Sequence, residues 1–285
     1  MFWHVLSMEN TKIRRRRMFW VLLTLIALLV LVIQIVLFST YENGMGGVAM
    51  PEEERLSIKG AITWPGSLVN ILTYIGGSAF GGLFFVILVG AVTAQEYTWR
   101  TLHLWLSRGV PRPLLVVAKF TALLLPALLF VLTALLIGGS ITALISMDIN
   151  NALHLDQANL TQLILSILRT AYTLLPYGAL TFFLAVVSRT TVVAISGGVS
   201  FVLLLENLLV QLLGLMGERL HEMTQYLPTR LAESLLSANQ LALETGVTSS
   251  ADSPDPWIAA LGIALWTLLF LGLSLWVFQK QDLSE

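Results

Sequence analysis

The residues with the clearest chemical potential are a carboxylate and two amides within an apolar stretch of the chain. Glu206 and Asn207 lie in the middle of segment 191–216, and Gln211 follows one helical turn later. A carboxylate at the centre of a membrane costs about 2.5–3.5 kcal/mol on insertion scales, so it should face a helix bundle, a cavity or a partner protomer. Two interpretations stay open. The three residues line a substrate pathway or a dimer interface, or Glu206 is a protonated or hydrogen-bonded packing residue.

Motifs for hydrolysis are absent or incomplete. The chain has no G-x-x-x-x-G-K-[ST] phosphate-binding loop, so we expect no ATP hydrolysis by this chain itself. His221-Glu222 begins a stretch similar to the zinc-protease motif, but Gln225 occupies the position of the second histidine. Cysteine is absent, which excludes disulfides, thiolate metal sites and cysteine nucleophiles. The sequence therefore predicts a protein that is not an enzyme and binds no cofactor or metal of its own.

The composition of the chain is typical of an integral membrane protein. Apolar residues make up 56% of the 285 residues and charged residues only 12%, with a mean hydropathy of +0.81. A soluble domain usually carries about 25% charged residues. The chain has no basic patch with interleaved aromatic residues, so nucleic acid is not an expected partner.

Six apolar segments are long enough to cross the ~30 Å hydrocarbon core as helices. They must be helical because backbone polar groups find no water in the bilayer. The segments are 18–38, 67–93, 114–145, 163–187, 191–216 and 257–278. The predicted fold is an all-α membrane protein with six transmembrane helices in a domain over residues 18–279, followed by a tail at 280–285. We expect segment 18–38 to be an uncleaved first span, because it is too long for a signal peptide core and no small-x-small cleavage site follows.

The distribution of lysine and arginine predicts the orientation. With the N-terminus in the cytoplasm, most of these residues fall in cytoplasmic segments, as the positive-inside rule requires. Both termini are then cytoplasmic, and the main inner loop is 94–113. Residues 1–17 combine apolar side chains with four consecutive arginines, which predicts an interfacial helix attracted to anionic lipid, with a disordered tail as the alternative. The outer loops are 41–66, 147–162 and 217–256.

Smaller features predict how the spans pack. Small residues four apart within 76–82 allow another helix to approach the second span closely. Pro126 and Pro176 are expected to bend the third and fourth spans. Arg169 is expected to extend its side chain to the outer membrane surface. Leucines within 227–236 form an apolar stripe with helical spacing, which predicts a helix on the outer membrane face or dipping into it.

The inner loop predicts an amphipathic helix. Residues 96–108 contain neither proline nor glycine, and Gly109 then favours a helix end. Trp99, Leu102 and Leu106 fall three and four residues apart, so they share one face. Such a helix either lies on the membrane surface or docks against a partner protein.

The residues around this helix resemble the signature of type-two ABC exporter permeases. Arg100 stands where that family commonly has glycine, which leaves the helix intact and makes it more basic. The six spans, the cytoplasmic termini and the long last outer loop extend the resemblance over the whole chain. The matching elements are Glu96-Tyr97, Thr101-Leu102, Leu106-Ser107-Arg108, Arg112 and Lys119.

The resemblance implies a permease subunit of an exporter in the plasma membrane of a prokaryote. In that family the inner loop is a coupling helix that fits a groove on a separate ATP-binding subunit, which holds ATP-Mg. The subunit pairs with a second copy or with a sister permease, among membrane lipids. The alternative function is an ion- or proton-coupled carrier that titrates Glu206, and the substrate is not indicated. The expected ATPase-coupling residues are Glu96, Trp99, Arg100, Thr101, Leu102, Leu106 and Arg108.

Overall fold

The structure is a computed structural model that describes residues 2–44, 51–99, 105, 109–150, 160–217, 223–243 and 254–281. It is 90% helical, and the residues it describes contain no strand. The predicted all-α fold with six spans is confirmed, because six helical stretches are long and apolar enough to cross a membrane. These stretches are Arg17–Asn43, Gly66–Thr98, Arg112–Ile149, Leu160–Ser188, Thr191–Leu215 and Pro256–Lys280.

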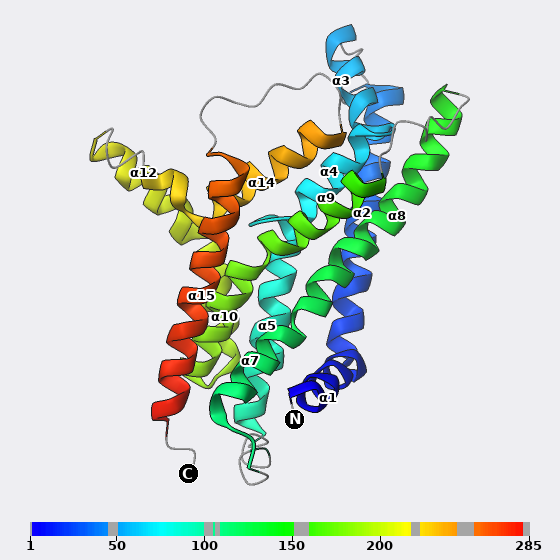
Figure 1. The fold of residues 1–285 in the computed structure, drawn as a ribbon. Coiled ribbons are helices and arrows are strands. Elements are labelled where there is room, and N and C mark those ends of the chain that lie inside the picture. Colours follow the sequence, from blue (N-terminus) through cyan, green and yellow to red (C-terminus); the bar gives the residue numbers. More distant parts are fainter. Residues whose placement is uncertain are drawn as a thin grey trace.

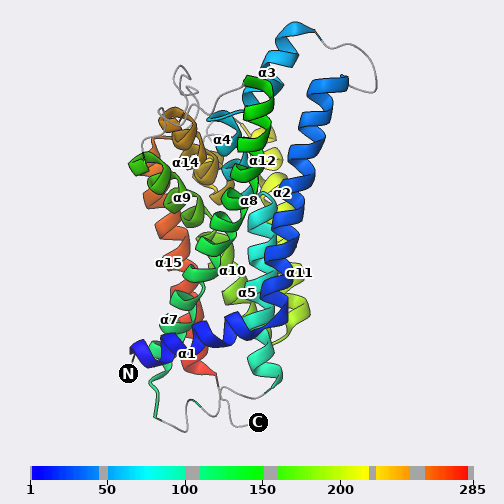
Figure 2. The same cartoon turned by 90° about the vertical axis from the view of Figure 1, so that its right-hand side faces the viewer.

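The N-terminal helix lies across one end of the bundle. α1 (Phe2–Arg15) turns at Arg16 into α2 (Arg17–Asn43), the first span, and α1 runs across the bundle whereas α2 runs along it (Figure 2). The C-terminal end of α15 (Pro256–Lys280), the last span, lies at the same end (Figure 1). We call this the α1 end, and the opposite end the α14 end.

The second span is interrupted in its middle. The sequence predicted one helix over 67–93, but the chain forms α4 (Gly66–Ile75) and α5 (Phe80–Thr98) with a turn between them. Gly77 adopts a left-handed backbone conformation with φ of 56°, which glycine reaches without steric cost. A Cβ atom on Gly76 would lie 2.6 Å from the side chain of Leu236. The small residues therefore permit close packing, as predicted, and they also break the helix.

Prolines interrupt the third and fourth spans near the predicted positions. The third span consists of α7 (Arg112–Ala122) and α8 (Leu124–Asn150), and the fourth of α9 (Leu160–Thr173) and α10 (Leu175–Ser188). The interruptions precede Pro126 and Pro176, because proline has no backbone N–H to bond to the carbonyl four residues earlier.

The fifth span is also irregular. It runs through α11 (Thr191–Ser200), the π-helical segment η2 (Phe201–Leu205) and α12 (Glu206–Leu215). α11 packs against α5 and α10, and α10 in turn packs against α15. Figure 1 shows α12 directed away from the other helices at the α14 end.

Two further helices lie at the α14 end. α3 (Glu52–Ile62) connects the first two spans, and α14 (Pro228–Leu243) follows the short segment η3 (Thr224–Tyr226). The helix predicted from the leucine stripe is α14. It packs against α4, α9 and α15, and its residues Leu231, Leu235 and Leu236 are buried.

We predict that Gly77→Val destabilises the turn between α4 and α5. The substitution forces a β-branched residue into the left-handed region, at a cost on the order of 1–3 kcal/mol, and its Cβ would lie 3.0 Å from that of Ala232 in α14. The midpoint of thermal unfolding in detergent should fall by several degrees. Gly272→Val is the matched control, because a Cβ there meets no atom within 4 Å. Equal midpoints for the two variants would contradict the packing described here.

Candidate functional site

α1 carries a carboxylate on its buried face. Its buried residues are Val5, Glu9 and Ile13, spaced four apart, and this face packs against α7. Glu9 is 2% exposed. Burying a carboxylate is costly unless a cation or hydrogen-bond donors accompany it. The position of Glu9 therefore requires partners from neighbouring helices.

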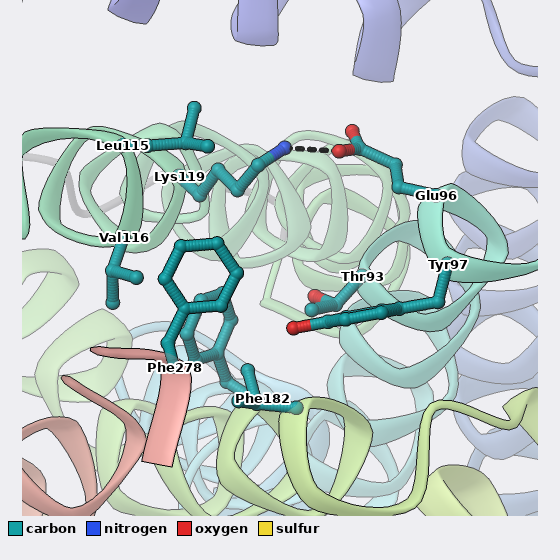
Figure 3. A pocket seen from close by; sticks show the side chains of 9 residues that line it. Thr93, Glu96, Tyr97, Leu115, Val116, Lys119, Phe182 and Phe278 are labelled. Atoms are coloured by element: carbon teal, nitrogen blue, oxygen red, sulfur yellow. Dashed lines mark hydrogen bonds and ion pairs between the residues drawn. The ribbon is translucent and has the colours of Figure 1, made fainter. Parts of the chain in front are cut away.

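Two carboxylates and two ammonium groups meet where α1, α5 and α7 converge. Lys12 Nζ lies 2.8 Å from Glu9 Oε1 and 3.3 Å from Glu96 Oε1. Lys119 Nζ lies 3.0 Å from Glu9 Oε1 and forms a close ion pair with Glu96 Oε2 (Figure 3). The side chains of Glu9, Glu96 and Lys119 are 3%, 4% and 11% exposed. We call these four residues the ion-pair cluster. Each cation contacts both anions, and the two positive charges balance the two negative ones.

Arg16 extends this contact to the end of α5. Its guanidinium donates a short hydrogen bond to Gln95 Oε1 and lies 5.5 Å from the ring centroid of Trp99. Burial lowers the pKa of Arg16, while the negative charges of Glu96 and Glu9 act in the opposite direction. The guanidinium stays protonated at neutral pH. The turn between α1 and α2 is thus fixed to the last residues of α5.

Two residues of the predicted coupling set, Glu96 and Trp99, are described. Glu96 is buried in the ion-pair cluster and faces α1 and α7. Trp99 follows the last residue of α5, and its side chain is 63% exposed. Trp105 lies with its ring centroid 4.8 Å from Lys12 Nζ. The other predicted members lie outside the described residues: Arg100, Thr101, Leu102, Leu106 and Arg108.

Sequence reasoning missed the contribution of α1 to this site. Lys119 entered only as part of the family resemblance, and Glu9, Lys12 and Arg16 were not identified as site residues. One signal was present: Glu9 occupies the apolar face that also carries Val5 and Ile13. A charge on such a face indicates a buried partner of opposite sign. Which residue is that partner cannot be predicted, because it depends on which distant helix packs against α1.

A small cavity lies beside the Glu96–Lys119 pair (Figure 3). Tyr97 of α5 forms part of its wall, and Phe182 of α10 and Phe278 of α15 line it. Its volume of about 10 Å³ has room for a single water molecule. The cavity is too small for a substrate, so the arrangement serves contact between helices.

Glu206 is buried near the α14 end and is hydrogen-bonded. Its carboxylate accepts a bond of 2.8 Å from the backbone N–H of Thr229 and another from the Thr229 hydroxyl. The hydroxyl of Tyr177 in α10 lies 3.0 Å from Thr229 Oγ1. Thr229 belongs to the first turn of α14, where a negative charge is favourable. The carboxylate is hydrogen-bonded and also lines a cavity between α12 and α14, so a part of Glu206 in a pathway or dimer interface stays a prediction.

Asn207 and Gln211 have more open surroundings. The Asn207 amide donates to Leu203 O of its own span at 3.0 Å, and both side chains are exposed. Gln211 and Asn207 line a cavity of about 170 Å³ between α12 and α14, together with Arg230 and Glu233. Their part in a pathway or dimer interface stays a prediction.

Arg169 does not simply extend to the outer surface as expected. It is half-buried, and its guanidinium donates to Ala238 O in α14 at 3.5 Å. A cation near the last turns of a helix complements the carbonyl end of its dipole. His221 and Glu222, the start of the incomplete zinc-protease motif, lie outside the described residues.

We predict that Lys119→Met destabilises the α1 end. Removing one partner of a buried ion pair costs about 3–5 kcal/mol, and the lower part of this range applies because Lys12 still faces both carboxylates. The midpoint of thermal unfolding in detergent should fall clearly. Lys59→Met in α3 should leave the midpoint nearly unchanged. If the two midpoints match, the ion-pair cluster contributes little to stability.

The sequence was compared with curated proteins and with protein families. No curated protein matches the sequence. A family described as "ABC-2 family transporter protein" matches residues 3–283, which confirms the resemblance to ABC permeases. Members of this family are membrane subunits that normally lack an ATPase site and are generally paired with an ATP-binding subunit. The chain belongs to the ABC-2 family of transporter proteins, as a multi-pass membrane subunit of an ABC system.

Proposed function

We propose that this subunit couples ATP hydrolysis on a separate ATP-binding subunit to the export of a substrate. The observation that carries this proposal is the ion-pair cluster, which joins α1, α5 and α7 where α5 runs into inner loop 94–113. Trp99 stands exposed at the start of that loop and supplies an aromatic anchor for a docking partner. ATP-Mg is bound by the partner, and this chain holds no cofactor.

The cluster provides a mechanical route from the loop into the spans. A displacement of the loop by the closing ATPase subunit acts first on the end of α5. The pair of Glu96 with Lys119 passes this movement to α7, and the bond of Arg16 to Gln95 passes it to α2. Separating the buried charges of the ion-pair cluster is costly, so α1, α5 and α7 move together.

The proposed assembly contains two permeases above two ATPase subunits, with this chain pairing with itself or with a sister permease. The exposed leucines of α12, with Asn207 and Gln211, form the surface for that pairing or for the pathway. Both termini face the cytoplasm of a prokaryotic cell. Trp3, Arg14 and Arg15 are exposed on α1 and contact lipid headgroups.

We predict that Trp99→Ala combined with Leu102→Ala abolishes recruitment of the ATP-binding subunit without affecting membrane insertion. Truncating an aromatic anchor costs about 2 kcal/mol or more, so affinity falls by roughly thirtyfold or more. The measurement is co-purification of the tagged subunit from its native host in mild detergent. Trp257→Ala is the control, because this tryptophan is 80% exposed but lies in the first turn of α15, at the α14 end.

Normal co-purification of the double variant would reject the coupling role of the inner loop. Recovery of the unmodified protein without any ATP-binding subunit would favour the ion- or proton-coupled carrier.

The absence of cysteine allows the orientation to be tested by single introduced thiols. Ser7 in α1 and Ser57 in α3 are both exposed. We predict that Ser57→Cys reacts with a membrane-impermeant maleimide in intact cells, whereas Ser7→Cys reacts only after permeabilisation. The reverse pattern would place the termini outside.

A further inference from the structure

The outer half of the fifth span has few contacts with the rest of the bundle. The main neighbours of α12 are η2, which directly precedes it, and η3, a short segment later in the chain. Its one buried residue is Glu206, and its other side chains are exposed or partly exposed. Figure 1 shows α12 standing apart from α15 and α10. Within the single subunit, Glu206 makes the hydrogen bonds that join α12 to another helix.

The first half of the same span is firmly packed. A Cβ atom on Gly198 of α11 would lie 2.6 Å from both Thr181 and Val86, so α11 lies very close to α10 and α5. The firm packing reaches into the π-helical segment, where Val202 is buried with Val86 and Tyr177, and ends at the exposed Leu203. In η2 the backbone N–H of Glu206 bonds to Phe201 O, five residues earlier. Short π segments are rare and interrupt the regular helical ladder, and they occur frequently at functional sites.

Glu206 joins α12 to the first turn of α14. Its carboxylate accepts both the backbone N–H and the hydroxyl of Thr229, and Tyr177 of α10 contacts the same hydroxyl. Glu206 is 2% exposed and Thr229 is partly buried, so both bonds are largely shielded from solvent. Hydrogen bonds to a charged group are stronger than those between neutral groups.

α14 is fixed to the other spans independently of Glu206. Asn239 Nδ2 donates to Thr170 Oγ1 of α9 at 3.2 Å, and Thr173 Oγ1 accepts the N–H of Gly77, in the break of the second span, at 2.8 Å. Leu231 packs against Ile263 of α15. α14 therefore belongs to a body formed with the second, fourth and sixth spans, and Glu206 connects this body to α12.

We propose that α12 is a hinged lever that opens and closes the α14 end of the permease, with η2 as its hinge and the Glu206–Thr229 contact as its latch. In the structure the latch is closed. Breaking it lets α12 turn about η2 away from α14 and widens the cavity of about 170 Å³ between them. This inference goes beyond the proposed function, because it concerns a movement that the isolated subunit can make.

The test measures the distance between α12 and the body with spin labels. Leu215→Cys marks the end of α12 and Leu241→Cys the far end of α14; these leucines are 85% and 41% exposed, and the protein has no native cysteine. A second pair, Leu241→Cys with Leu265→Cys on α15, reports on the body alone. Double electron–electron resonance on the purified subunit, without ATPase or nucleotide, gives the distance distributions.

We predict that Glu206→Gln adds a second, displaced distance population to the Leu215–Leu241 pair and leaves the Leu241–Leu265 pair unchanged. The amide retains the size of the side chain and loses the charge, which shifts the equilibrium towards the open lever by on the order of tenfold to a hundredfold. Glu54→Gln is the matched control: it removes the same charge from an exposed carboxylate of α3, so it should leave both distributions unchanged.

Two outcomes would overturn the proposal. An unaltered Leu215–Leu241 distribution in Glu206→Gln would show that this contact does not hold α12. A change in the Leu241–Leu265 distribution would show that α14 leaves the body when Glu206 is altered, so α12 alone would not be the moving part. Because neither measurement needs a partner subunit, failure here is distinguishable from failure of the proposed coupling to ATP.

Discussion

A buried charge must have a partner, and this constraint determines how both ends of the protein are built. At the α1 end, Glu9 lies on the apolar face of α1, and Glu96 lies at the end of a membrane-spanning helix. Both carboxylates are almost fully buried, so each requires a cation at close range. Lys12 and Lys119 satisfy both at once. The position of α1 across the bundle therefore depends on this cluster as well as on apolar packing against α7.

The backbone is irregular where the helices need to approach each other. The turn between α4 and α5 lets α14 contact the second span, because neither Gly76 nor Gly77 has a Cβ atom to keep it away. The freed N–H of Gly77 then receives a partner in Thr173. In a bilayer such an interruption is tolerated only where protein groups bond the freed backbone. Gly76 and Gly77 therefore allow the close approach of α14, and the hydroxyl of Thr173 on α9 bonds the backbone N–H that the turn leaves free.

The sequence was sufficient to predict the six spans, because length and apolar character decide whether a helix crosses a membrane. It did not predict the break at Gly77, since an average over a window of some twenty residues hides a local turn. It correctly indicated that the carboxylate of Glu206 needs a partner or a polar cavity. It could not name Thr229 as the partner, because that contact depends on how residues 217–243 return to the bundle. The pairing of Glu9 with Lys119 was beyond reach for the same reason.

The two ends share a division of roles between apolar and charged contacts. Apolar faces, such as Phe19 stacked on Phe130 with ring centroids 6.5 Å apart, can slide over small distances and keep most of their contact. Ion pairs and charge-assisted hydrogen bonds weaken steeply once distance and angle depart from their optimum. They therefore favour discrete positions of the helices they join. At the α1 end, several such contacts hold three helices as one unit, which suits the transmission of force. At the α14 end, the hydrogen bonds from α12 to α14 depend on Glu206, which suits release. Two carboxylates and two lysines join helices at the α1 end, whereas Glu206 is the one buried residue of α12 at the other. This difference is what we expect of one rigid end and one end that opens as proposed.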